Sequence, residues 1–536
     1  MKLKLKKLVT ACLVTTVAIS SMVTQAFAYT DYMEAANGTY VYNQNGFDVA
    51  IPDAYEYKYS VSLKTLDING ELAEGETALS VTSPNDMFVA FNEDLYVTDS
   101  EAGIIICFDS NLKYKGIIKE FKRTENTAIL GKTGKADIES EITKLKTPSG
   151  VFVTEDKDYY IADTGNNRVL VADKDFNVLM EIYMPEDLLG TTLNSFLPTK
   201  VVVDSVGRIS VVAKNINNGI MQFSTEGFFT GYTGAPKVHV DAFTKFLRKF
   251  STAEQRAQML QYVPTEYNNI KIDKKNFIWG TISSLSTSSI STAIANKDLS
   301  GSTTPIRKLN TGGTDVLRRK GIYAPLGDLN FIDAPSKITD VGLGPNNIYT
   351  MLDTTRGKLF TYNNDGVLLY AFGGKGNRKG DVQTPVAIDY IGDKILVLDS
   401  ALCEIIIYEP TYYGQLLIEA EGYYMNGDYE NAYGRWADVA ELNSNFEYAY
   451  VGLGNARYSV QNYEEAMDYY EYADNTEGYS KAKEGLRKQG SEKAFPVIFT
   501  AIIVIVVLTL IYMIVKKFRV YASGEFDVLR APSEDE

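Results

Sequence analysis

The stretch "YYIADTGNNRVLVAD", Tyr159–Asp173, joins two apolar, alternating runs through a short polar turn. Asp163 ends the first run and Arg168 opens the second, with the turn between them. Taken alone, such a polar cluster could be a ligand site or the corner of a β-hairpin. The rest of the chain decides between these interpretations, because the same pattern recurs.

Five other segments share this pattern of a Pro or polar turn, an alternating strand, a short turn and a second strand that ends in or near Asp. Period-two alternation of β-branched and aromatic residues, bounded by Gly, Asn, Asp and Pro, predicts strands and hairpins. Six copies with almost no helix between them predict a mainly β fold, a six-bladed β-propeller. The six segments are Ser83–Ser110, Thr147–Asp175, Leu197–Gly227, Pro264–Ile282, Ala334–Gly366 and Thr384–Pro410.

The spacing of the repeats is uneven because three insertions interrupt them, at Lys119–Lys146, Gly231–Val263 and Ser283–Thr304. The second has apolar residues at helical steps, which predicts a helical insertion at about 236–262. The third is rich in Ser and Thr and is expected to be mobile. The alternating run Tyr55–Leu63 precedes the first repeat, and we expect it to supply the outer strand of the last blade and so close the ring.

The second repeat resembles the NHL repeat, in which a strand ending in Asp is followed by a turn and an Asn-Arg pair. The resemblance covers Tyr55–Tyr413 and implies the propeller fold without implying a particular function. Other repeats depart from the pattern: Asp99, Asp353 and Asp399 keep the Asp, Ile104 and Glu404 replace the Arg, and Ala213 replaces the Asp.

The turn residues of the second repeat are therefore interpreted as structural. Gly165, Asn166 and Asn167 suit the left-handed conformations of a tight loop, and Asp163 and Arg168 can pair with each other or bond the backbone.

The pattern changes to a helical one at 414–490. Asn426–Trp436 aligns with Val460–Tyr470, which resembles tetratricopeptide repeats; a plain helical bundle is the alternative. Such a module can present a groove to a protein partner or serve as a rigid stalk, and both remain open. The aromatic candidates for a groove are Tyr429, Trp436, Tyr463 and Tyr470.

The two ends of the chain predict export and membrane anchoring. A basic start, an apolar run and Ala26-Phe27-Ala28 predict a signal peptide at 1–28, followed by an N-terminal segment at 29–54. Residues 494–515 carry no charge and are long enough to span a membrane. Lys516, Lys517 and Arg519 follow, so the positive-inside rule places the tail, 516–536, in the cytoplasm and the N-terminus outside.

Charge and composition limit the functions further. The chain has 68 acidic against 53 basic residues, a net charge of −15, which argues against nucleic-acid binding. Its single histidine, His239, falls in the helical insertion, so a Ser-His-Asp triad or a His-rich zinc site is not expected. A calcium site made only of oxygen ligands stays possible, although no calcium-loop motif is present. No catalytic residue or cofactor is otherwise predicted.

The layout as a whole resembles bacterial surface proteins that accompany carbohydrate ABC transporters. That resemblance implies a single-pass protein of the cell membrane whose extracellular propeller and helices bind a protein partner, a glycan or both. The expected function is binding or scaffolding; the alternative is a surface-tethered, calcium-dependent hydrolase or lyase of the lactonase-like kind. The sequence does not indicate an oligomeric state.

Overall fold

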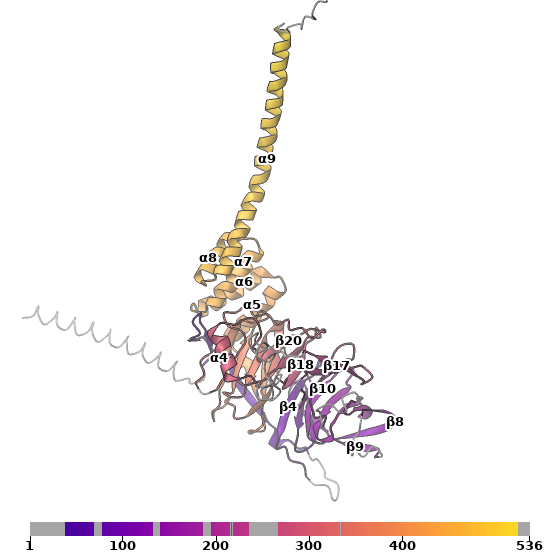
Figure 1. The fold of residues 1–536 in the computed structure, drawn as a ribbon. Helices are drawn as coiled ribbons and strands as arrows, with labels where there is room; N and C mark the ends of the chain where they lie inside the picture. The colour runs from indigo at the N-terminus through magenta and orange to yellow at the C-terminus, as the bar shows by residue number, and fades with distance from the viewer. Residues whose placement is uncertain are drawn as a thin grey trace, which may run out of the picture. The chain divides into compact units, whose positions relative to one another are not determined.

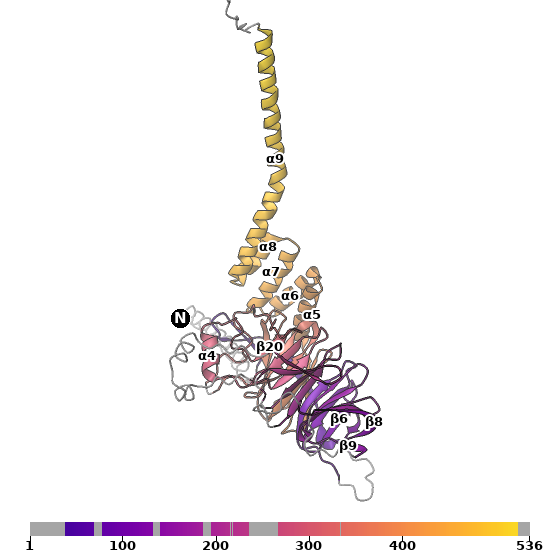
Figure 2. The same cartoon turned by 45° about the vertical axis from the view of Figure 1, so that its right-hand side comes forward.

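Six separate β-sheets follow one another along the first part of the chain (Figures 1 and 2). The computed structural model describes residues 38–68, 78–131, 140–185, 195–214, 216, 218–234, 266–332 and 334–523. It divides into two units, Met1–Met425 and Asn426–Glu536. The predicted signal peptide, the predicted helical insertion at 236–262 and the chain after 523 lie outside the described residues.

Each sheet is one blade, whose repeat strands pair antiparallel in chain order. Short turns connect most of these strands, and the insertion Ser283–Thr304 separates two of them in blade 4. The first strand of each blade contacts the first strand of the next, and β25 of blade 6 contacts β4 of blade 1, so the ring is closed. The predicted six-bladed propeller is thus confirmed. The strands are β4 (Pro84–Val89), β5 (Leu95–Asp99), β6 (Ile104–Phe108) and β7 (Tyr114–Ile118) in blade 1; β10 (Pro148–Val153), β11 (Tyr159–Asp163), β12 (Arg168–Ala172) and β13 (Asn177–Ile182) in blade 2; β14 (Pro198–Val203), β15 (Ile209–Ala213), β16 (Ile220–Phe223) and β17 (Phe229–Thr233) in blade 3; β18 (Asn269–Ile272), β19 (Ile278–Thr281) and β20 (Ile306–Leu309) in blade 4; β21 (Ile338–Leu343), β22 (Tyr349–Asp353), β23 (Lys358–Tyr362) and β24 (Leu368–Phe372) in blade 5; and β25 (Pro385–Ile391), β26 (Lys394–Asp399) and β27 (Glu404–Pro410) in blade 6.

Blade 6 is completed by a strand from the other end of the propeller. β3 (Tyr55–Ser62) pairs antiparallel with β27, from Tyr55 opposite Pro410 to Ser62 opposite Glu404. This confirms the closing role predicted for the run before the first repeat. The pairing covers the outer edge of β27 and joins the two ends of the propeller within one blade.

Three additions were not predicted from the sequence. β8 (Glu120–Leu130) and β9 (Ile142–Lys144) arise from the first insertion and extend blade 2, and β1 (Tyr40–Tyr42) and β2 (Asp48–Ala50) extend blade 5. The Ser/Thr-rich insertion, expected to be mobile, instead forms helix α4 (Thr287–Ala295). Hydroxyl side chains cap helices well, which explains how such a composition starts a helix.

In blades 1, 2, 5 and 6 the second strand ends in Asp, and this residue joins the strand to the segment that enters the blade. The buried carboxylate of Asp399 accepts backbone N–H groups of Gln383 at 2.6 Å and Thr384 at 2.9 Å before β25. Its other oxygen accepts those of Ala401 and Leu402, both at 3.0 Å. Asp99 makes the equivalent four bonds in blade 1.

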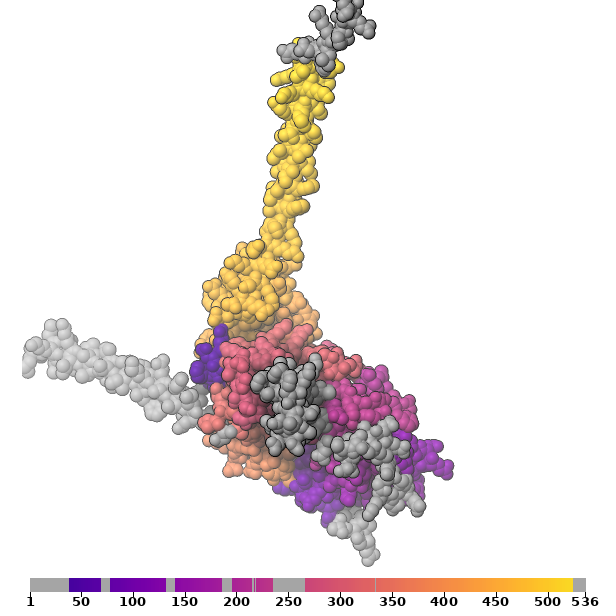
Figure 3. Space-filling model, in the orientation of Figure 1, coloured from indigo at the N-terminus to yellow at the C-terminus, as the bar shows by residue number. Residues whose placement is uncertain are grey.

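Four helices make up the described part of the second unit, and each packs on the next: α6 (Tyr429–Leu442), α7 (Glu447–Ser459), α8 (Tyr463–Tyr472) and α9 (Thr476–Ala522). α6 and α8 begin at Tyr429 and Tyr463, the two residues that the sequence alignment pairs. An 18-residue stretch of α9 has a mean hydropathy of 3.1, and no other described residue covers it (Figure 3). Its length and composition suffice to cross a membrane.

Replacing Asp399 by Ala should lower the free energy of unfolding of the propeller by about 3 kcal/mol, because buried N–H groups lose their acceptor. Urea unfolding of the full chain in detergent, followed by circular dichroism, measures the change. Asp156→Ala, at an exposed position in a turn of blade 2, is the control. Equal midpoints for the two variants would contradict the role given to Asp399.

Candidate functional site

The first strands of the six blades surround the central channel in two layers of side chains. The strand register defines equivalent positions in the six blades. Each first-layer residue lies opposite the second-strand residue that comes just before the position of the recurring Asp. The first layer contains Asp86, Gly150, Lys200, Asn269, Asp340 and Ala387. The second layer, two residues further along each strand, contains Phe88, Phe152, Val202, Lys271, Gly342 and Asp389.

Two lysines cross the channel to reach aspartates two blades away. Lys200 of blade 3 pairs with Asp86 of blade 1. The first-layer residue of the blade between them is Gly150, where a Cβ would lie 3.3 Å from Lys200 Cδ and 2.7 Å from a backbone oxygen. A side chain at this position would therefore crowd the lysine.

The second crossing has the same form. Lys271 Nζ of blade 4 lies 3.1 Å from Asp389 Oδ2 of blade 6, and the blade between them again carries a glycine, Gly342, in the second layer. Lys271 also lies 3.8 Å from Asp340 Oδ2 in the first layer. We call the pairs Lys200–Asp86 and Lys271–Asp389 the channel struts.

The second strut is held by further bonds. Asp389 accepts the backbone N–H of Val89 at 3.0 Å, and Asp340 accepts the Asn269 amide at 2.5 Å and the Ile388 N–H at 2.8 Å. Burial acts to lower the pKa of Lys271, but Asp340 and Asp389 outweigh it and raise that pKa above its ordinary value. Burial raises the pKa of Asp340 to about 6, although Lys271 opposes the change.

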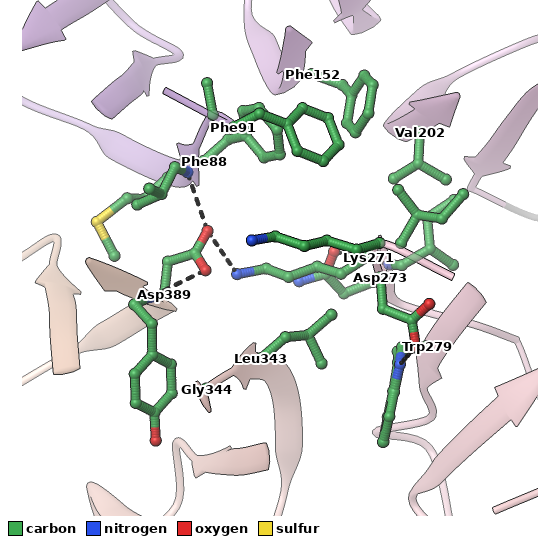
Figure 4. Close-up of a pocket in the computed structure, with 18 of the residues that line it drawn as sticks. Phe88, Phe91, Phe152, Val202, Lys271, Asp273, Trp279, Leu343, Gly344 and Asp389 are labelled. Carbon is green, nitrogen blue, oxygen red and sulfur yellow. Dashed lines mark hydrogen bonds and ion pairs between the residues drawn. The ribbon is translucent and has the colours of Figure 1, made fainter. Parts of the chain in front are cut away.

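A pocket of about 580 Å³ opens beside the struts and takes lining residues from every blade. We call it the funnel. Phe88, Phe91 and Phe152 gather on one side of it, with the Phe88 and Phe152 ring centroids 4.9 Å apart (Figure 4). Lys271 lies across the middle, and Leu343 lies opposite the rings. The funnel thus has an aromatic wall and a charged floor.

One part of the funnel lining is fixed to a helix. The short turn η4 (Pro345–Asn347) lines the pocket, and Asn346 and Asn347 both adopt left-handed backbone conformations, with φ of 56° and 61°. The Asn346 amide donates to the Ile418 carbonyl of α5 (Tyr412–Met425) at 2.9 Å. α5 therefore holds this turn in place from outside the funnel.

The turn residues of the second repeat lie away from the funnel, inside blade 2. Arg168 Nε lies 2.8 Å from Asp163 Oδ2, and Arg168 Nη1 lies 3.0 Å from Glu181 Oε1. Asp163 and Arg168 are almost fully buried. A buried ion pair surrounded by hydrogen bonds organises the hairpin and offers no open side to a ligand.

The three residues between them have different roles. Asn166 donates its amide to Asp163 Oδ2 at 2.7 Å, and only Asn167 takes the left-handed conformation, with φ of 56°. Gly165 does not have a positive φ; a Cβ there would lie 2.7 Å from the Lys146 carbonyl, so close approach explains the glycine.

The four aromatic groove candidates divide into two kinds. Trp436 and Tyr470 are buried, with Trp436 packed against Gly452 and Tyr470 against Gly454 and Gly478. They hold helices together and do not line an open surface. Tyr429 and Tyr463 are half-buried at the starts of α6 and α8.

Within the described residues, no group of three or more His, Cys, Asp or Glu side chains is placed to hold a metal ion. His239 lies outside those residues. The possible calcium site stays a prediction.

Known proteins resemble the chain in fold alone. No family model matches it, and no curated protein matches it. Solved structures that resemble it include virginiamycin B lyase from Staphylococcus aureus (14% identity, 66% of this chain and 99% of that chain, TM-score 0.37) and a streptogramin B lyase (13%, 62% and 96%, TM-score 0.36). A protein provisionally assigned as a gluconolactonase also resembles it (10%, 67% and 94%, TM-score 0.35). At these values the likenesses carry no argument about activity.

The funnel and its struts were not predicted from the sequence. A signal was present, since Lys200 and Lys271 interrupt strands that are otherwise mostly apolar. Their partners are distant in the sequence, so the pairing could not be inferred from spacing.

The Lys200–Asp86 strut should behave as a coupled pair. Lys200→Met and Asp86→Leu should each lower the free energy of unfolding by about 3 kcal/mol, because each leaves one buried charge unpaired. The double variant should lose clearly less free energy of unfolding than the sum of the losses in the two single variants. Urea unfolding of the four proteins gives the coupling.

The same cycle on Lys122 and Glu141, whose side chains are 56% and 68% exposed, is the control and should give almost no coupling. Additive effects at Lys200 and Asp86 would show that the strut does not form.

Proposed function

We propose that the protein is a membrane-anchored, extracellular binding protein whose funnel captures a small ligand. The funnel carries this proposal: its volume of about 580 Å³ falls within the range of about 300–1,000 Å³ that is typical of ligand pockets. Its lining combines an apolar wall with a few fixed polar groups, which is the usual composition of a binding site.

Binding is favoured over catalysis by the state of the charged groups. Lys200, Lys271, Asp86 and Asp389 are engaged with one another in the channel struts. A general acid or base must exchange a proton with a substrate within hydrogen-bond reach. Groups that are held by buried partners suit a rigid floor better than proton transfer.

The remaining features support a surface location. The predicted signal peptide, the apolar part of α9 and the lysines after it together favour an extracellular propeller with a cytoplasmic tail. The resemblances to NHL and tetratricopeptide repeats, and to proteins that accompany carbohydrate ABC transporters, favour a role in delivering a ligand or assembling a transport complex. In this role the helices of the second unit contact a protein partner.

The orientation can be tested by single cysteines at the two ends of the apolar segment. Ser491→Cys should react with a membrane-impermeant maleimide in intact cells, whereas Ser523→Cys should react only after lysis. Both variants are made in a background that lacks the native cysteines. Labelling of the Ser523→Cys variant in intact cells would show that this end lies outside the cell and would contradict the proposed orientation.

The funnel can be tested by fluorescence because the chain has only two tryptophans. Trp279 lines the funnel and Trp436 lies in the helical unit. Full-length Trp436→Phe protein in detergent should change its emission when a small-molecule extract of the growth medium or cell wall is added. The Trp279→Phe variant is the matched control and should not respond.

The Trp279→Phe variant retains Trp436. A change of emission in this variant alone would place the ligand in the helical unit and contradict the funnel assignment. Turnover of a lactone or ester in the presence of calcium would contradict the binding role in favour of a hydrolase.

A further inference from the structure

We propose that the funnel recognises an aromatic or large aliphatic side chain of a peptide, with the backbone N–H and C=O of one neighbouring residue facing the Lys271–Asp389 strut. This inference rests on the proposed binding function and specifies the class of ligand. Three features of the funnel support it: the chemistry of its wall, the geometry of its floor and the balance of charge at its rim.

The wall consists of Phe88, Phe91 and Phe152 and has no polar side-chain atom. Phe91 is 44% exposed although it is a large apolar residue, so its ring is available for contact. An apolar side chain can cover these rings without losing hydrogen bonds to water. A sugar can stack its C–H face on such rings, but the hydroxyl groups at its edge need several hydrogen-bond partners, and the wall supplies none.

The floor offers one cation and one anion side by side. The side chains of Lys271 and Asp389 are 11% and 12% exposed, and their charged atoms lie 3.1 Å apart. In an extended peptide the N–H and C=O of one residue point to the same side of the backbone, so its carbonyl can face the ammonium group while its N–H faces the carboxylate. The two groups keep each other as partners, and the ligand need not bring a charge.

The rim does not select for charge. Lys274 and Lys275 line the pocket in the turn after β18, and Glu93 and Asp273 line it as well. The opposite charges balance, so neither an acidic nor a basic ligand gains a clear electrostatic advantage. Specificity therefore depends on the apolar wall and on the neutral polar contacts of the floor.

The test titrates full-length Trp436→Phe protein in detergent with four probes and follows Trp279 emission. The probes are acetyl-Ala-Phe-Ala-amide, acetyl-Ala-Ser-Ala-amide, maltose and cellobiose. The Phe peptide should bind at least about tenfold more tightly than the Ser peptide, a difference of about 1.4 kcal/mol. Neither sugar should bind as tightly as the Phe peptide.

Phe91→Ser should weaken binding of the Phe peptide about tenfold and leave the Ser peptide unchanged. Phe228→Ser is the matched control, since Phe228 is 62% exposed and does not line the funnel. Asp389→Asn, which keeps the shape of the floor, should weaken both peptides alike. Circular dichroism of each variant confirms that it is folded.

Four results would overturn the inference. A sugar that changes Trp279 emission while the Phe peptide does not would overturn it and leave the proposed binding function standing. Equal affinities for the Phe and Ser peptides, or an unchanged affinity in Phe91→Ser, would show that the wall does not select an apolar side chain. Absence of any response to either peptide would also reject it, and the extract experiment then decides whether the funnel binds another ligand.

Discussion

The buried carboxylates that end the second strands are the constraint on which the propeller depends. Asp99 and Asp399 each accept four backbone N–H groups, and Asp353 accepts those of Lys337 and Thr355 in blade 5. Each carboxylate fixes the chain just before the strand that borders the channel, so it sets where the channel side chains lie. In blade 3, where Ala213 occupies the corresponding position, hydroxyl groups of blade 2 bond the Pro198 carbonyl instead.

The struts place charge where most proteins place apolar residues. Burying a charge costs free energy that an ion pair offsets only if its geometry and additional hydrogen bonds are good. Lys271 meets this condition, because Asp389, Asp340 and the Ile388 carbonyl all contact its ammonium group. The consequence is a floor whose polar atoms are fixed before any ligand arrives, which lowers the entropy lost on binding.

Repetition made the fold predictable from the sequence, and the lack of repetition made the site unpredictable. The stretch at Tyr159–Asp173 recurs in six versions, so its strands, turns and blade could be inferred from local pattern alone. The additional strands β8 and β1 occur once each, and α4 arises from a composition that usually indicates a loop. The struts join residues that are far apart in the chain, Asp86 with Lys200 and Lys271 with Asp389, and only the closed ring brings them together. Trp436 and Tyr470 were candidates because they align, yet residues that align in a repeat are often those that pack its interior.

The pairing of β3 with β27 has a consequence for the order of folding. Synthesis begins at the N-terminus, so the strand at Tyr55–Ser62 is made before all six repeats, while its partner at Glu404–Pro410 is the last strand of the sixth repeat. Until the last strand is available, β3 has an unpaired edge and blade 6 is incomplete, and such edges favour aggregation. Contacts so distant in sequence also form slowly. A chain that is exported as it is made would therefore need its early blades protected until the final one has crossed, and a shortened chain that ends before β27 would expose β3 permanently.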